Sequence, residues 1–272
     1  MTRRSVTFSC EGEELFGTLD MPASPKRCGL LIVTGGNEVR AGAWNGQAQF
    51  AARIAASGYP VFRFDRRGTG DSAGNNAGFR ASGPDIAAAI AAFREAVPGL
   101  HAIVGFGNCD AASALMLGGG VGLDGLILSN PWTFDEEAPD EAPAAVLRQH
   151  YRRRLADPAA VKRLLTGKVA LGSLLRSLAA SLRPAAKVQA LEGLAREMEL
   201  GLERFDGPLR FLVAGRDRTG QAFSAKWNGA RKDQGDPRIV TCPEASHSYV
   251  EPQAQTWLAE EVLDFLGGFD GR

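Results

Sequence analysis

Continuous apolar runs separated by helical patterns constrain the fold of this chain more than any other feature of its sequence. Four such runs are GLLIVTGG at 29–36, YPVFRFD at 59–65, HAIVGFG at 101–107 and DGLILSNP at 124–131. A short run without polar alternation is typical of a strand that is buried on both faces. Because helical patterns separate the runs, right-handed crossovers predict a parallel sheet covered by helices.

Further strand patterns at both ends of the chain extend this sheet. SVTFSC and ELFGTLDM alternate in the manner of an opening antiparallel pair. GPLRFLVAG and PRIVTC follow much later, and a terminal amphipathic helix covers 255–269. The sequence therefore predicts an α/β fold with a mostly parallel eight-stranded sheet flanked by helices.

The strand and helix rhythm stops between residues 132 and 205. This stretch contains an acidic run and then helical patterns without a convincing strand. It is too long for an ordinary loop, so we interpret it as a helical cap inserted after the sixth strand. The predicted domains are an α/β core of residues 1–131 and 206–272 and a cap of residues 132–205.

Composition excludes several classes of protein. Lys plus Arg and Asp plus Glu number 31 each in 272 residues, so the net charge gives no general electrostatic case for binding nucleic acid. No apolar run is long enough for a membrane span, and no apolar segment follows the N-terminal arginines. We expect a cytoplasmic protein that acts on a small molecule; the sequence leaves its oligomeric state open.

The cysteines show neither metal-ligand nor disulfide spacing. They stand at Cys10, Cys28, Cys109 and Cys242, without a CxxC pair or a linked histidine. The sequence therefore predicts no metal site. The glycine-rich segment after the fourth strand lacks GxGxxG with a helix at its last glycine, so no cofactor is expected either.

Cys109 lies where a strand turns sharply into a helix. Gly107-Asn108-Cys109-Asp110-Ala111 has small residues two positions before and after the cysteine, the pattern of a nucleophile elbow. Asp217 and His247 each follow a later strand, in the chain order nucleophile, acid, base. We expect His247 to accept the proton of Cys109 and Asp217 to orient the imidazole.

Each member of this candidate triad has a rival. Ser113 is the competing hydroxyl, one helical turn beyond the elbow, where it would face the wrong way. His101 opens a strand at the opposite end of the sheet, and His150 falls in the predicted cap. Asp206 and the acidic residues of the predicted cap are the alternative acids. The helix N-terminus favours a thiolate at Cys109, whereas an inward Asp110 carboxylate would oppose it.

Four segments resemble one known family. GGNEVRAG, FDRRGTGDSAG, GNCDAAS and SNPW look like those of the hydrolases associated with exosortase A systems, the first of the two hydrolases of those loci. That family belongs to the α/β-hydrolase superfamily, which the whole chain resembles. The resemblance implies an α/β-hydrolase fold, a cysteine at the elbow and a link to exopolysaccharide production. It implies no particular substrate.

The same resemblance suggests an oxyanion hole. Gly35 and Gly36 are similar to the oxyanion loop of the superfamily, with Gly36 or Asn37 offering one backbone N–H and Asp110 the other. Thr34 stands where a histidine is usual, so the choice between Gly36 and Asn37 stays open.

Substrate contacts are expected from residues near the strand ends. Arg40 offers a fork for a carboxylate or phosphate, with Glu38 beside it, and Trp132 and Trp44 are candidates to line a pocket. The cap carries ten basic residues against a single Asp157 between Arg148 and Lys187. Such a run is usually a solvated helix face; the alternative is that it attracts an anionic substrate.

A thiolate nucleophile suits esters and thioesters. We therefore predict an acyl hydrolase that works through an acyl-cysteine intermediate. An acyltransferase acting on a glycan or another acceptor is the second hypothesis. A hydrolase-fold protein with weak catalysis that binds a ligand or partner is the third.

Overall fold

The computed structural model describes residues 1–135, 190–231 and 235–271. Its centre is an eight-stranded sheet in the order β1-β2-β4-β3-β5-β6-β7-β8. The strands are β1 (Thr2–Cys10), β2 (Glu13–Met21), β3 (Cys28–Val33), β4 (Val61–Phe64), β5 (Ala102–Asn108), β6 (Gly125–Ser129), β7 (Leu209–Ala214) and β8 (Ile239–Cys242). Only β2 runs against its two neighbours, and every other pairing is parallel. The predicted eight-stranded, mostly parallel sheet is confirmed.

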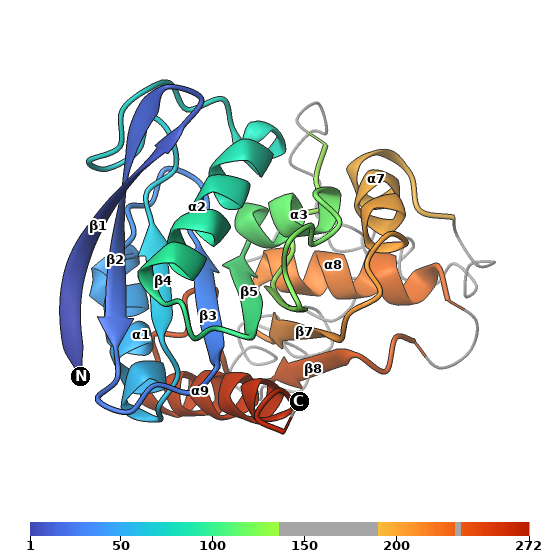
Figure 1. Ribbon diagram of the computed structural model, residues 1–272. Helices are drawn as coiled ribbons and strands as arrows, with labels where there is room; N and C mark the ends of the chain where they lie inside the picture. The colour runs from blue at the N-terminus through green and yellow to red at the C-terminus, as the bar shows by residue number, and fades with distance from the viewer. Residues whose placement is uncertain (136–189, 232–234, 272) are drawn as a thin grey trace, which may run out of the picture.

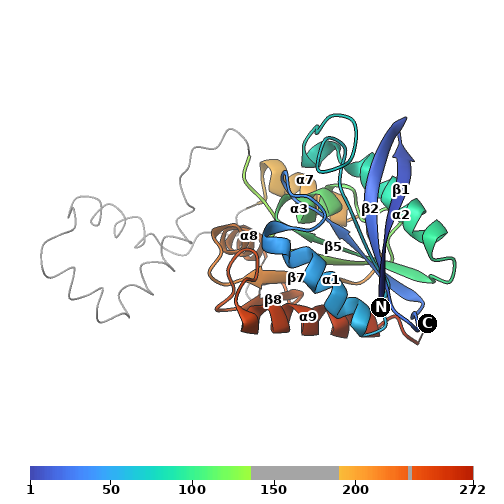
Figure 2. The same ribbon diagram turned by 90° about the vertical axis from the view of Figure 1, so that its left-hand side faces the viewer.

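Helices cover both faces of the sheet (Figure 1). They are α1 (Gly46–Ala56), α2 (Gly83–Ala96), α3 (Asp110–Leu117), α7 (Gly193–Leu202), α8 (Arg218–Gly229) and α9 (Pro252–Gly267), with short 3-10 turns η1 (Ala43–Asn45) and η2 (Phe79–Ala81). Helices α1 and α9 pack side by side on one face (Figure 2). Helices α2, α3, α7 and α8 contribute to the hydrophobic cluster on the other face.

The apolar runs form the buried centre of the sheet. All side chains of β3, β4 and β6 are buried, whereas β1 is largely exposed at the edge of the sheet. Strand β3 lies between β4 and β5, so the chain leaves β3 toward one edge and returns to its other side as β5. A crevice opens at such a reversal, beyond the carboxyl ends of the strands. The loops after β3 and β5 therefore meet there.

The described parts of the predicted cap lie close to the core. Helix α7 packs on α3, with Leu194 and Met198 buried in the core cluster. Its first turn is held by Asp135, whose carboxylate accepts the Leu194 N–H at 2.9 Å. Residues 136–189, which include His150 and the basic run from Arg148 to Lys187, lie outside the described residues.

Candidate active site

The elbow after β5 holds Cys109 in a backbone conformation that side chains rarely adopt. Its φ is 62° and its ψ is −127°. Such strain is found where a nucleophile is presented on a sharp strand-to-helix turn. A Cβ on Gly107 would lie 2.7 Å from backbone atoms of Ala111 and Ala112, so the turn requires a glycine there. The elbow pattern in the sequence thus corresponds to a real strained turn.

The structure brings Cys109, Asp217 and His247 together. The Nδ1 atom of His247 lies 2.9 Å from Oδ2 of Asp217, and the Cys109 side chain also hydrogen-bonds to this imidazole. Asp217 follows β7, is nearly buried and accepts the Gly220 N–H at 2.9 Å as the cap of α8. These partners fix the carboxylate that faces His247.

His247 is strongly basic in this arrangement. The hydrogen bond to Asp217 and then the one to Cys109 raise its pKa from 6.5 to about 10, although burial opposes the cation. The imidazole is therefore protonated at neutral pH. A protonated imidazole beside a thiol stabilises the thiolate, as in other cysteine nucleophiles.

Buried amides and hydroxyls hold the loop that carries His247. The side-chain amides of Asn108 and Asn130 point their N–H groups at the His247 carbonyl oxygen, at 3.3 and 3.5 Å. Asn130 also accepts the Ala214 N–H at 2.7 Å, which ties this network to β7. The Tyr249 hydroxyl lies 2.9 Å from the Ser129 hydroxyl below the loop. In the sequence, the polar residues of SNPW are the only sign of this network, which was not predicted.

The Asp110 side chain decides which backbone group is available for an oxyanion. Its carboxylate accepts the Gly36 N–H, at 2.7 and 2.8 Å from the two oxygens. The Asn37 and Asp110 N–H groups have no acceptor among the described residues. A Cβ on Gly35 would lie 2.5 Å from the Asp110 carboxylate, so the loop approaches the elbow closely. This arrangement favours Asn37 over Gly36 as the partner of the Asp110 N–H.

Arg66 compensates the charge of Asp110. Its guanidinium is almost fully buried, lies 3.9 Å from the Asp110 carboxylate and donates to the Gly36 carbonyl oxygen. Burial lowers the pKa of Arg66, and the charge of Asp110 works in the opposite direction. Asp110 therefore turns toward Arg66 and the oxyanion loop. The glycine-rich segment that contains Arg66 is weighed above only as a possible cofactor loop, so Arg66 is a site residue that the sequence pattern did not identify.

The Arg40 side chain pairs with groups of the chain itself. Its guanidinium donates to Thr18 and pairs with Asp65 and Asp71, and its backbone N–H also donates to Asp65. These bonds join the oxyanion loop to the loop after β4. The Arg40 guanidinium, which was expected to bind a substrate anion, thus holds two loops together, because the carboxylates of Asp65 and Asp71 already pair with it.

Trp132 lies directly beside the elbow. Its backbone N–H donates to the Cys109 carbonyl oxygen at 3.3 Å, and its indole N–H donates to the Phe134 carbonyl oxygen at 3.0 Å. The half-buried ring packs edge-on against Phe134. Trp132 is therefore close enough to border a substrate bound at Cys109.

The rivals of the triad residues lie apart from it. Ser113 is buried and donates its hydroxyl to the Trp132 carbonyl oxygen at 2.7 Å. His101 is exposed just before β5, at the end of the strand opposite the elbow. Asp206 is exposed, whereas Asp217 contacts the imidazole.

In the part of the chain that the structure describes, no three His, Cys, Asp or Glu side chains come close enough to hold a metal ion. Within the same residues, no helix has the length and apolar character needed to cross a bilayer.

Comparison with protein families gives a match over most of the chain. The family described as the alpha/beta hydrolase family matches residues 30–261, which include the elbow, Asp217 and His247. The chain belongs to the alpha/beta hydrolase family. No curated protein sequence matches this hydrolase.

Solved structures share the fold of this hydrolase at low identity. An esterase from Pyrococcus furiosus is 14% identical with a TM-score of 0.62, over 98% of this chain and 90% of the esterase. Est1E from Butyrivibrio proteoclasticus, solved with bound ferulic acid, is 16% identical with a TM-score of 0.58, over 98% and 100%. A serine hydrolase without a lid from Xanthomonas campestris is 13% identical with a TM-score of 0.60, over 99% and 95%. Similarity at these identities shows the shared fold.

Proposed function

We propose that this hydrolase cleaves esters or thioesters through a Cys109-His247-Asp217 triad. The supporting observation is the connected set of side chains at the crevice, in which one imidazole contacts both the Asp217 carboxylate and the Cys109 side chain. The strained elbow aims the sulfur at the same place. The esterase among the structural neighbours agrees with this class of reaction.

The reaction has two balanced steps. The Cys109 thiolate attacks the acyl carbonyl carbon, and the bond to the leaving oxygen or sulfur breaks as His247 donates its proton to that atom. Water then attacks the acyl-cysteine, returns a proton to His247 and releases the carboxylic acid and the thiolate. Asp217 holds the imidazole throughout. The N–H groups of Asn37 and Asp110 stabilise the negative oxygen in both steps.

The resemblance to exosortase A-associated hydrolases supports a more specific setting. We place the activity in the cytoplasm, in a step that serves exopolysaccharide production. Water and an acceptor hydroxyl compete for the same acyl-cysteine. Product analysis with and without a glycan acceptor therefore separates hydrolysis from acyl transfer.

The proposal is tested by replacing the nucleophile. Cys109→Ala should lower kcat/KM for aryl and thioester substrates by at least about a thousand-fold, because no other group supplies the covalent step. Cys242→Ala is the matched control, since Cys242 is also a partly exposed free thiol. Mass spectrometry of the acylated protein should locate the acyl group on Cys109. Turnover by Cys109→Ala at the rate of the unaltered enzyme would refute the triad.

The same variants test the binding-protein hypothesis. Iodoacetamide should modify Cys109 in the native enzyme at neutral pH, because a thiolate is the reactive form. An unmodified Cys109 in a folded protein that still binds acyl esters would favour a binding role.

A further inference from the structure

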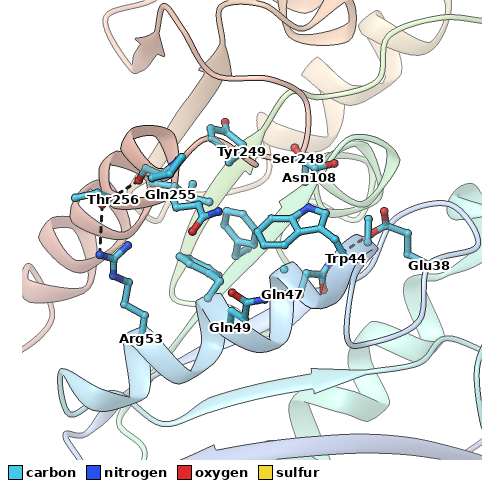
Figure 3. A pocket seen from close by; sticks show the side chains of 16 residues that line it. Glu38, Trp44, Gln47, Gln49, Arg53, Asn108, Ser248, Tyr249, Gln255 and Thr256 are labelled. Carbon is cyan, nitrogen blue, oxygen red and sulfur yellow. Dashed lines mark hydrogen bonds between the residues drawn. The ribbon is translucent and has the colours of Figure 1, made fainter.

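A cavity of about 420 Å³ lies between α1 and α9, and Figure 3 shows the side chains that line it. Its inner end is bordered by Asn108 and Ser248, the sequence neighbours of Cys109 and His247. Glu38 of the oxyanion loop lies at this end as well. The volume of the cavity falls within the range of small-molecule sites. The triad side chains themselves are not among the lining residues, so the cavity lies next to the reacting centre and extends away from it along α1.

The position of the cavity selects the part of the substrate that fits it. In the first step of the proposed mechanism His247 donates a proton to the leaving atom, so the leaving group must lie beside the imidazole. Ser248 and Tyr249, the residues that follow His247, form a wall of the cavity. Trp132 and Phe134 lie beside the elbow in the segment after β6, and neither borders the cavity. The cavity thus corresponds to the leaving group rather than to the acyl group.

The walls suit an uncharged body with polar groups. Phe50, Phe106 and Leu258 provide apolar contact, and Trp44 adds a broad aromatic face at the mouth. Side-chain amides between them offer hydrogen bonds in both directions; they belong to Gln47, Gln49 and Gln255. Apolar walls with a few polar groups are typical of sites that orient a ligand.

The two ends of the cavity carry opposite charges. Glu38 occupies the inner end and Arg53 the outer end, on opposite sides of the view in Figure 3. Arg53 donates only to the Thr256 hydroxyl, at 3.3 Å, and pairs with no carboxylate of the described residues. Arg53 comes seven positions after Gly46 at the start of α1, which corresponds to about 10 Å along the helix axis. The carboxylate of Glu38 is offset by the nearby His247 cation, whereas the Arg53 guanidinium at the outer end is left to pair with an anion.

We propose that the cavity binds the leaving group of the substrate, an alcohol or thiol whose far end is anionic and pairs with Arg53. This inference rests on the proposed acyl-cysteine mechanism. It assigns substrate selection to α1 and α9, which belong to the core of the fold, whatever the role of the basic segment predicted as a cap.

Matched thioesters test the inference. Butyryl thioesters of ω-mercaptoalkanoic acids and of the corresponding ω-mercaptoalkanols differ only in the charge of the far end. With chains of three, six, eight and eleven carbons, we expect kcat/KM to favour the acid most at the length that reaches Arg53. Arg53→Gln should remove a preference for the acid of about threefold by raising KM for the acid thioesters. Their kcat and the kinetic constants for the alkanol thioesters should stay unchanged. Arg53→Lys should retain most of the preference, and added salt should weaken it.

Arg27→Gln is the matched control, because Arg27 is an exposed arginine before β3, at the end of that strand opposite the oxyanion loop. Equal rates for acid and alkanol thioesters at every length, unaffected by Arg53→Gln, would overturn the inference and leave the acyl hydrolase intact. A preference for the acid that persists in Arg53→Gln would also overturn the inference, since another group would then recognise the carboxylate of the leaving group. Failure of the enzyme to cleave any of these thioesters or an aryl ester would instead count against the proposed function itself.

Discussion

Replacing Asp217 by Asn separates the charge of the triad acid from its structural role. An asparagine keeps an oxygen that can accept the Gly220 N–H, so α8 should keep its cap. The negative charge beside His247 is lost. Because the hydrogen bond to Asp217 is the largest cause of the raised pKa of His247, that pKa should fall from about 10 toward 6.5.

The size of the effect follows from the protonation of His247. At pH 8 an imidazole with a pKa of about 10 is almost entirely cationic, whereas one with a pKa of about 6.5 is only about 3% cationic. If the cation donates the proton to the leaving group, kcat/KM of Asp217→Asn should fall at pH 8, by at most about 30-fold because the contact with Cys109 still raises the pKa. The alkaline limb of the pH profile should move from about pH 10 toward neutral pH.

Two measurements check this reasoning. The pH dependence of kcat/KM reports the group in the free enzyme, and NMR titration of the three histidines reports His247 directly, assigned with a His247→Gln variant. Glu251→Gln is a suitable control, since its carboxylate lies close to the same loop and accepts the Ser246 N–H and hydroxyl. An alkaline limb near pH 10 in both the unaltered enzyme and Asp217→Asn would refute the assignment of the general acid.

Three further variants probe the scaffold of the site. Gly107→Ala should destabilise the fold by about 2 to 3 kcal/mol in urea unfolding, because its Cβ would meet backbone atoms at 2.7 Å; Gly83→Ala, where nothing lies within 4 Å, should not. Asn130→Ala removes buried hydrogen bonds to β7 and to the His247 loop, so it should lower the free energy of unfolding by about 2 kcal/mol. It should also lower kcat with little change in KM, and an unchanged kcat would contradict the positioning role of Asn130. Burial raises the pKa of Asp236, but hydrogen bonds from Arg238 and Trp227 outweigh burial and lower this pKa from 3.8 to about 2. The ionised carboxylate should therefore contribute about 2 kcal/mol to the free energy of unfolding above pH 3.8, and this contribution should disappear as pH falls through about 2. Urea unfolding of Asp236→Asn at pH 7 and pH 2 measures the difference, and a gap that does not shrink at pH 2 would exclude this linkage.

Local patterns determined much of the architecture. Continuous apolar runs identify strands buried on both faces, and their order with the intervening helices predicts the parallel sheet without knowledge of any contact. The spacing of Gly107, Cys109 and Ala111 identifies the elbow, because only small residues permit such a turn. These features depend on neighbours within a few residues, which is why the sequence alone reveals them.

The tertiary structure decided where polar side chains point. Asp110 bonds to the Gly36 N–H and lies beside Arg66, although these residues belong to loops after three different strands. Arg40 lies close to the site in sequence, yet Asp65 and Asp71 take its guanidinium. The cavity between α1 and α9 depends on two helices that are about 200 residues apart in the chain. Hydrogen-bond partners are chosen among groups that folding brings together, so a pattern along the chain identifies the candidates and the packed structure selects among them.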